Sequence, residues 1–242
     1  MKNEKISFAK NGFLKIASLL SMDEVEELRG IYDDLLKDNI RTAHLRSDLA
    51  GIEQNTDKKV ERITQIMRPS TVATELLNNS AYKKAMIWAK NLLGDDMELD
   101  FDMMINKAPH TNTPTPWHQD AAYWIDMPDK RSASCWIALD EVFEENGCMW
   151  FIPKTEGAPI LKHKNLPNGG ALYCETETKL AQSVPLKIGG CTFHDGFTLH
   201  YSHGNSTHSQ RRALILNFRP KKMIAFEREQ GINHIGERKQ RN

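Results

Sequence analysis

The pattern of apolar and polar positions divides the chain into a helical first part and a strand-rich second part. Ser21 and Glu24 form the sequence pattern of a capping box, and the apolar positions after them recur at helical spacing. This pattern predicts a helix over 22–37. The same spacing predicts two further helical regions, 70–79 and 82–93, and the second of these stops before a glycine.

Two stretches of this first part are less regular. Residues 8–16 resemble a short strand with a turn at Asn11-Gly12. The helical pattern fades over 38–59, where polar residues dominate, so this segment is expected to form a loop or a lid.

From Met97 onwards, apolar positions alternate with polar ones or form short runs bounded by glycine and proline, as in β-strands. The expected strands cover 97–106, 116–120, 134–139, 148–152, 186–188, 192–193, 198–202 and 211–218. The last strand is apolar on both faces and must be covered on both. Helices followed by many short strands predict a mainly β fold: a double-stranded β-helix, or jelly roll, with the N-terminal α-helices on its outer face.

The length of 242 residues suits a single domain over 1–242. We expect a helical cover over 18–95, a jelly-roll core over 97–220 and a polar tail over 221–242. The tail is rich in Lys, Arg and Glu, and it is predicted to be solvated or to form a short helix.

Charge and cysteine usage narrow the function classes. Lys plus Arg and Asp plus Glu each number 32, so the chain has no electrostatic footprint for nucleic acid or for an anionic membrane. The 4 cysteines are well separated, without a CxxC pair, and read as free thiols, with a disulfide as the weaker alternative. No signal peptide or membrane helix is visible, so a cytoplasmic protein is expected.

The first candidate chemistry lies in the aromatic stretch 116–120. Alternate residues of a strand point to one face, so His118 and Asp120 are expected to project together. An imidazole and a carboxylate on one face are two ligands for one metal ion. Such a pair by itself is more often a polar strand edge than a metal site.

A second group of polar residues makes a metal site the more favoured interpretation. His200 and Ser202 share a strand face, and Arg211 opens the last strand. Two histidines and one carboxylate leave about three positions open on an octahedral metal, as in non-heme Fe(II) oxygenases. A closed structural zinc site requires about four protein ligands. An arginine inside a barrel needs an anionic partner, and a carboxylate is the partner it binds with two hydrogen bonds.

At this point the sequence resembles the phytanoyl-CoA dioxygenase family over roughly 8–220. The motifs that carry the resemblance are Pro116-Trp117-His118-Gln119-Asp120, residues 145–153, and Thr198-Leu199-His200 through Asn205 to Arg211. The family implies a double-stranded β-helix, Fe(II), and 2-oxoglutarate as co-substrate.

By this resemblance, His118, Asp120 and His200 match the iron ligands. Arg211 matches the residue that pairs with the distal carboxylate of 2-oxoglutarate. Ser202 matches the hydroxyl residue that assists this arginine. Arg212 follows directly, but strand alternation turns it to the other face.

The sequence departs from the family pattern at Lys154-Thr155-Glu156 and at Gly189-Gly190, and neither departure touches the matched residues. An alanine or glycine in place of Asp120 would indicate a halogenase, so the aspartate favours hydroxylation or a related oxidation. The resemblance therefore implies an oxygenase that consumes O2 and 2-oxoglutarate, releases succinate and CO2, and acts on a small molecule as a monomer or small homo-oligomer.

Two alternatives stay open: a jelly-roll metalloenzyme that does not use 2-oxoglutarate, and a binding jelly roll without turnover. Candidate substrate contacts are Tyr123, Trp124, Met103 and Tyr201, although such residues are more often plain core. Trp136 and Trp150 are assigned to the core. Five histidines stay unassigned: His110, His163, His194, His203 and His208.

Overall fold

A computed structural model of the protein describes residues 2–51, 61–155, 157–167 and 170–235. The predicted loop or lid beyond residue 51 and the predicted tail beyond residue 235 lie outside these ranges. Within them, no helix combines the length and the hydrophobicity that crossing a lipid bilayer requires.

Two antiparallel sheets form the core of the described chain. The larger sheet has the strand order β1-β11-β6-β13-β4-β3-β2. Its strands are β1 (Phe13–Ile16), β2 (Arg46–Asp48), β3 (Ile63–Met67), β4 (Met97–Lys107), β6 (Ala133–Ala138), β11 (Cys191–His194) and β13 (Arg211–Pro220). The smaller sheet has the order β10-β7-β12-β5. Its strands are β5 (Thr115–His118), β7 (Met149–Phe151), β10 (Gln182–Val184) and β12 (His200–Ser202). A separate pair joins β8 (Lys164–Asn165) to β9 (Leu172–Tyr173).

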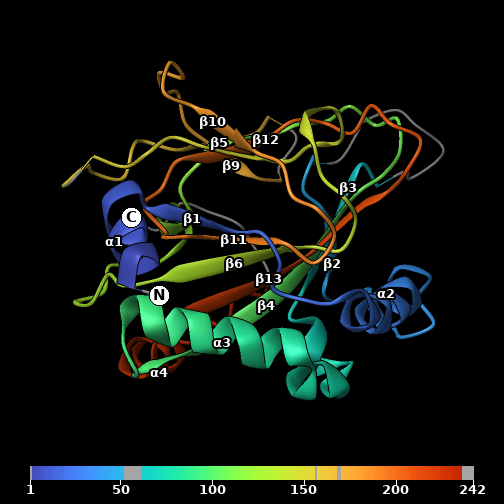
Figure 1. Ribbon diagram of the computed structural model, residues 1–242, viewed down its shortest axis with the longest axis horizontal. Helices are drawn as coiled ribbons and strands as arrows, with labels where there is room; N and C mark the ends of the chain where they lie inside the picture. The colour runs from blue at the N-terminus through green and yellow to red at the C-terminus, as the bar shows by residue number, and fades with distance from the viewer. Residues whose placement is uncertain (1, 52–60, 156, 168–169, 236–242) are drawn as a thin grey trace.

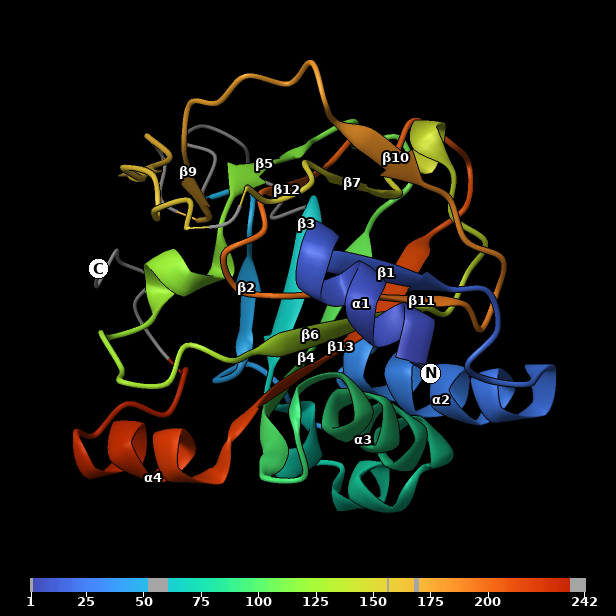
Figure 2. The ribbon, with the colours of Figure 1, turned by 60° about the vertical axis from the view of Figure 1, so that its left-hand side comes forward.

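The molecule is layered, as predicted. The smaller sheet lies over one face of the larger sheet, and helices cover the opposite face (Figure 1). Figure 2 shows the same order of layers from another side. The α-helices are α1 (Lys2–Asn11), α2 (Met22–Leu36), α3 (Ser80–Leu93) and α4 (Lys221–Glu229). Four short 3-10 helices are η1 (Pro69–Thr71), η2 (Thr74–Asn78), η3 (Asp120–Tyr123) and η4 (Glu144–Asn146).

The capping box of α2 is present as predicted. The Ser21 hydroxyl accepts from the Glu24 backbone at 3.3 Å, and the Glu24 carboxylate accepts from the Ser21 backbone at 2.8 Å. The cap starts the helix in the register that buries Val25, Leu28 and Leu35 against the sheet. The predicted helix over 82–93 corresponds to α3, which ends before Gly94.

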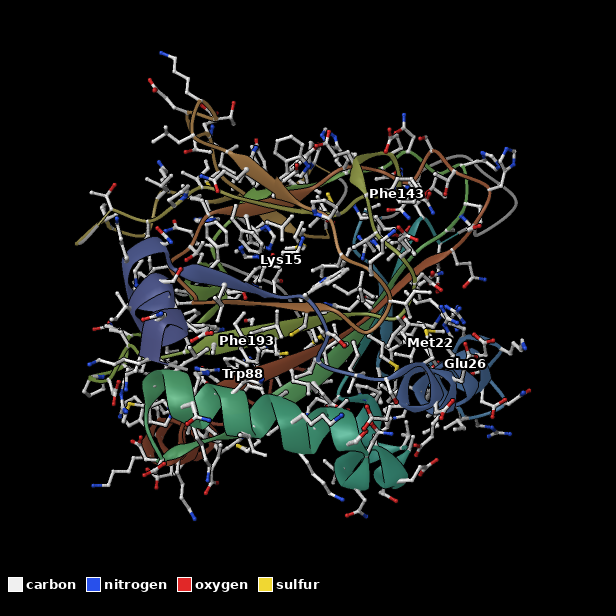
Figure 3. The ribbon with its side chains drawn as sticks, in the orientation of Figure 1. Lys15, Met22, Glu26, Trp88, Phe143 and Phe193 are labelled. Atoms are coloured by element: carbon white, nitrogen blue, oxygen red, sulfur yellow. The ribbon has the colours of Figure 1, made fainter. Side chains whose placement is uncertain are left out.

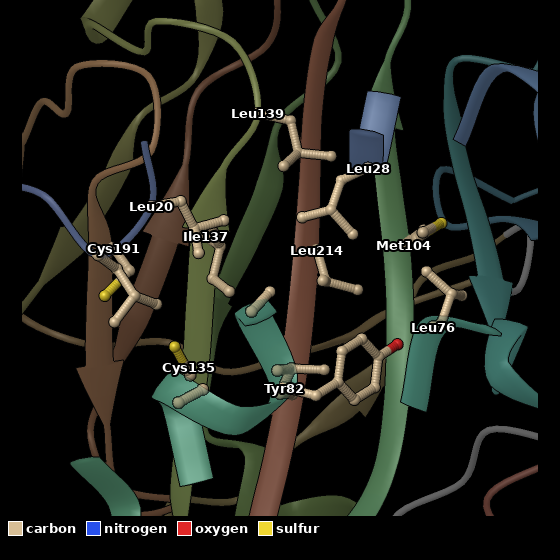
Figure 4. Packing of buried hydrophobic residues seen from close by; sticks show 14 of the residues in the cluster. Leu20, Leu28, Leu76, Tyr82, Met104, Cys135, Ile137, Leu139, Cys191 and Leu214 are labelled. Atoms are coloured by element: carbon tan, nitrogen blue, oxygen red, sulfur yellow. The ribbon is translucent and has the colours of Figure 1, made fainter. Parts of the chain in front are cut away.

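Alternation along β13 divides the core in two. Leu214, Leu216 and Phe218 join the helices in one apolar cluster, part of which Figure 4 shows. Ala213 and Ile215 face the smaller sheet and join a second cluster. Trp88 of α3 packs beneath Phe193 of β11, with ring centroids 6.3 Å apart (Figure 3). The strand that is apolar on both faces is therefore covered on both, and the jelly-roll prediction is confirmed.

Leu28 tests the contribution of the helical cover to stability. Its side chain is fully buried, so Leu28→Ala is expected to lower the free energy of unfolding by about 2–5 kcal/mol, because truncation leaves a cavity. Urea unfolding measures this. Leu180, 69% exposed, is the matched control, and its alanine variant should change stability by no more than about 0.5 kcal/mol. Equal effects of the two changes would contradict the proposed packing.

Several local predictions were wrong. Residues 8–11 belong to α1 rather than to a strand, because Phe8 is buried in the helical layer; the expected Asn11-Gly12 turn is the end of this helix. The region 70–79 forms 3-10 helices rather than an α-helix. The expected strand 186–188 is reduced to an isolated bridge between Val142 and Leu186.

The predicted helical cover was also incomplete as a description of the first part of the chain. This part supplies β2 and β3, which extend the larger sheet beyond β4. Both strands are short, and sheet pairing rather than local pattern defines them.

Candidate metal centre

A cavity of about 260 Å³ opens between the two sheets. Its walls include His118, Asp120, His200, Ser202 and Arg211, so the fold brings together every residue of the predicted metal and co-substrate site.

Strand pairing places the two histidines side by side. His118 ends β5, and His200 begins β12 directly opposite it, with ring centroids 4.1 Å apart. Asp120 Oδ1 lies 3.9 Å from His118 Nε2 and 3.6 Å from His200 Nε2. One ligand atom from each of the three residues lies within 4.8 Å of the other two, a spacing that one metal ion can bridge.

The reason for this convergence differs from the predicted one. Strand β5 ends at His118, and Asp120 is the first residue of η3. The carboxylate therefore reaches the histidines through the turn that follows the strand, and not through strand alternation.

Backbone carbonyls set the tautomers of both rings. His118 Nδ1 lies 2.7 Å from Pro116 O, and His200 Nδ1 lies 2.9 Å from Thr198 O. A carbonyl oxygen only accepts, so Nδ1 carries the hydrogen in each ring. The lone pair of Nε2 is left free to bind a metal, the arrangement that metal-binding histidines have.

The protonation states of the two histidines and the aspartate favour the binding of a metal cation. Burial lowers the pKa of His118 and brings the pKa of His200 well below its ordinary value. Burial alone would raise the pKa of Asp120, but the neighbouring imidazoles, His200 foremost, hold it below the usual range. Neutral imidazoles and an ionised carboxylate are the forms that bind metal.

The second oxygen of Asp120 contacts residues to which the sequence assigned no role. Ser134 Oγ lies 2.9 Å from Asp120 Oδ2, and His194 Nε2 lies 3.3 Å from the same oxygen. Asn217 Oδ1 is 2.8 Å from Ser134 Oγ. One signal was available in the sequence: Asn217 interrupts the apolar strand 211–218 on the same face as Arg211.

Arg211 is buried with unused hydrogen-bond donors. It is 1% exposed, and within the described ranges neither Nε nor Nη1 has a hydrogen-bond partner. Its guanidinium carbon lies 5.2 Å from the ring centroid of Trp136, which lines the cavity as well as belonging to the core. Burial lowers the pKa of Arg211 to about 10, so the side chain is still a cation at neutral pH.

Arg212 faces the other way, as alternation predicts. Its guanidinium contacts Asp140 at 2.9 Å and Asp33 at 2.7 Å. The two adjacent arginines therefore differ sharply: Arg212 is ion-paired on the helical side of the sheet, whereas Arg211 lies in the cavity without an ion pair to any residue that the structure describes.

The four candidate substrate contacts, Tyr123, Trp124, Met103 and Tyr201, all line the same cavity. Their role as contacts stays a prediction. Two further segments complete the wall. Residues 44–49, within the stretch expected to be a loop or lid, supply Leu45 and Arg46 among others, and the C-terminal segment supplies His234 and Ile235.

Of the two alternatives predicted for the C-terminal segment, the short helix is present as α4, and the segment is more than a solvated tail. Asp100 and Glu227 are both at most 4% exposed, and they are ion-paired with Arg219. His234 Nε2 lies 2.8 Å from Glu227 Oε2, and its ring stacks on Phe101 with centroids 4.2 Å apart. This buried ion cluster holds residues 221–235 against the cavity wall, a contact that was not predicted for the polar tail.

The cluster should make residues 221–235 sensitive to acid. Burial alone would raise the pKa of Asp100 and of Glu227, but His234 and the neighbouring Arg219, with Arg228 beside Asp100, hold both below their ordinary values. A lowered folded-state pKa contributes stability above the pKa of the unfolded chain, about 4, and that stability is lost as the pH falls further.

The protection of residues 221–235 against hydrogen exchange, taken relative to the intrinsic rate at each pH, is therefore expected to fall below about pH 4 before the central strands are affected. Arg219→Met should bring this loss of protection to higher pH, because it removes the cation that both carboxylates contact. Protection in this segment that follows the central strands at every pH would contradict the prediction.

Two imidazoles and one carboxylate inside a jelly roll are the donor set typical of non-heme Fe(II) oxygenases, and the same cavity holds an arginine with unused donors among the described residues. The family description phytanoyl-CoA dioxygenase matches residues 8–213, and the chain belongs to this family.

Two relatives illustrate the range of the family. Peroxisomal phytanoyl-CoA dioxygenase of Rattus norvegicus is 24% identical over 224 residues, covering 87% of this chain and 66% of the rat protein. A probable alpha-ketoglutarate-dependent hypophosphite dioxygenase of Stutzerimonas stutzeri is 23% identical, covering 87% of this chain and 76% of that protein. The chain thus spans just under two thirds of the length of the rat relative.

Solved structures support the same fold. EvdO2 from Micromonospora carbonacea var. aurantiaca is 28% identical with a TM-score of 0.76, and the match covers 90% of each chain. Its complex with 2-oxoglutarate has a TM-score of 0.73 at the same identity and coverage. The epimerase SnoN, in complex with Fe3+, alpha ketoglutarate and nogalamycin RO, is 20% identical with a TM-score of 0.66, covering 90% of this chain and 82% of SnoN.

Proposed function

We propose that the protein is an Fe(II)- and 2-oxoglutarate-dependent oxygenase that oxidises a small molecule. The observation that carries this proposal is the shared cavity: three metal-ligand side chains and a buried arginine with unused donors all line it.

His118, Asp120 and His200 fit Fe(II). Their donor set of two neutral imidazoles and one carboxylate leaves about three positions for other ligands on an octahedral ion. Iron bound there together with 2-oxoglutarate would supply the activation of O2 that ends in succinate, CO2 and an oxidised product.

Arg211 and Ser202 fit the co-substrate. A dicarboxylate that binds the metal at one end leaves its second carboxylate for a cation, and Arg211 offers Nε and Nη1 for two hydrogen bonds. Ser202 is 3% exposed and lines the same cavity. Such an arginine distinguishes this proposal from a metalloenzyme without 2-oxoglutarate, since an unpaired buried cation is costly.

The remaining wall favours a compact, largely apolar substrate. Met103, Tyr123 and Trp124 line the cavity together with residues of the segments 44–49 and 234–235. The side chains that surround the cavity exclude water and orient the substrate, and Asp120 in the ligand set favours hydroxylation or a related oxidation over halogenation.

We also propose a reducing, cytoplasmic location. Cys135, Cys148, Cys174 and Cys191 are all buried and free, as expected for thiols that form no disulfide. The expectation of a monomer or small homo-oligomer stays a prediction.

The deciding experiment measures the wild-type chain with Fe(II) and 2-oxoglutarate. Under anaerobic conditions, 2-oxoglutarate should produce a visible charge-transfer band with the bound Fe(II). When air is admitted, the protein should convert the 2-oxoglutarate to succinate even without a prime substrate. A metalloenzyme that does not use 2-oxoglutarate would bind iron without this band, and a binding protein without turnover would release no succinate. Either result would overturn the proposal.

A further inference from the structure

Three buried polar side chains form one row across the larger sheet. Asn217 of β13 pairs with Ser134 of β6, and Ser134 pairs with His194 of β11. All three are at most 3% exposed. Because residues paired across neighbouring strands point to the same face, this row faces the cavity together. Within the same face, Ile215 and Trp136 are the next residues along β13 and β6, so the polar row interrupts an apolar surface.

The row contacts only one oxygen of Asp120. Ser134 Oγ and His194 Nε2 approach Oδ2, at 2.9 Å and 3.3 Å. The metal-binding nitrogens of His118 and His200 approach Oδ1 instead, at 3.9 Å and 3.6 Å. The two carboxylate oxygens are therefore divided between the sheet and the metal position.

The hydrogens can be assigned from chemistry. An ionised carboxylate oxygen only accepts, so His194 carries its hydrogen on Nε2 and Ser134 directs its hydroxyl hydrogen to Asp120. Asn217 Oδ1 lies 2.8 Å from Ser134 Oγ, but the single hydroxyl hydrogen of Ser134 is already directed to Asp120. We therefore assign the Asn217 amide the half-turned orientation, in which its N–H donates to Ser134 Oγ. Each member of the row thus donates toward Asp120.

We propose that His194 and Ser134, supported by Asn217, are positioning residues that hold Asp120 Oδ2 and leave Oδ1 as the only carboxylate oxygen for the metal. This inference rests on the proposed function and deepens it. An octahedral ion has about six positions, and two imidazoles with a two-point co-substrate take about four of them. Only a carboxylate that binds through one oxygen then leaves a position for O2.

The experiment reads the metal site with Co(II), whose visible absorption reports its coordination number. His194→Phe keeps the ring but removes the donor, and Ser134→Ala removes the hydroxyl. Each should weaken Co(II) binding by about 10- to 100-fold, the range for residues that orient a metal ligand, and should change the Co(II) absorption toward higher coordination. His194→Gln keeps an N–H near the position of Nε2 and should restore most of the affinity and the wild-type spectrum.

Thr192→Val is the matched control. Thr192 lies on β11 two residues before His194, is fully buried, and its hydroxyl has no partner in the described part of the chain. Its variant should bind Co(II) with the wild-type affinity and spectrum. Thermal unfolding of each variant without metal identifies any loss of fold.

The outcomes separate this inference from the proposed function. Wild-type affinity and an unchanged spectrum in both His194→Phe and Ser134→Ala would overturn the positioning role while leaving the metal site intact. A His194→Gln variant that folds but resembles His194→Phe would also overturn it, since the N–H would then be irrelevant. A wild-type chain that binds no Co(II) would overturn the metal site itself.

Discussion

Replacing His200 by alanine is expected to abolish succinate formation and to weaken Fe(II) binding by more than about 100-fold. That exceeds the upper range for residues that only orient a ligand, because His200 supplies a ligand atom itself. Its Nε2 lies 3.6 Å from Asp120 Oδ1, and its Nδ1 hydrogen is already used by Thr198 O, so Nε2 is the ring atom that the variant loses from the metal position. Equilibrium dialysis with Fe(II) under anaerobic conditions measures the affinity.

His203 is the control for this change. It lies just beyond the same strand, is exposed, and contacts the Tyr201 hydroxyl at 3.0 Å rather than the metal position. His203→Ala should keep the iron affinity of the wild type. Retention of tight Fe(II) binding by His200→Ala would remove that histidine from the ligand set.

Arg211→Met is expected to raise the 2-oxoglutarate concentration for half-saturation by about 100-fold or more while iron still binds. Two hydrogen bonds to a charged group are at stake, each worth about 1.5–3 kcal/mol. The same change should stabilise the chain without ligands by about 1 kcal/mol or more, because a buried cation without an anionic partner is replaced by an apolar side chain of similar size.

Arg212→Met should show the opposite behaviour. This arginine is paired with Asp140 and Asp33, so its loss is expected to lower stability without changing the 2-oxoglutarate requirement. Titration of the charge-transfer band measures the co-substrate affinity, and thermal unfolding measures stability. Parallel effects of the two variants in both measurements would show that burial and pairing do not distinguish the arginines.

The local sequence pattern was sufficient to predict structure where the contacts within a single helix or strand determine it. The capping box and apolar spacing predicted α2, and alternation in β13 predicted which arginine enters the cavity and that the strand is covered on both faces. The prediction was wrong where packing or pairing with other elements determines the local structure. Residues 8–11 became helical because Phe8 packs into the helical layer, and β2 and β3 exist because they pair with β4.

His194 shows the limit of pattern at the site. Alone in the sequence it had no partner that assigned it a role, and it lies 74 positions from the aspartate that it contacts. Ser134 and Asn217, 83 positions apart, meet only because β6 and β13 are adjacent strands in one register. The buried ion cluster that ties His234 to Asp100 is equally invisible before the chain is folded.

The sequence by itself determined the fold class and the family, and it predicted the two histidines, the aspartate and the arginine that line the cavity, because these depend on residue types at short spacings in a set order. Only the tertiary structure decided which oxygen of Asp120 faces the histidines, which polar row holds the other, and which distant segments complete the cavity wall. The physical reason is that strand register and sheet order, which set these contacts, arise from the packing of the whole core and not from any one segment.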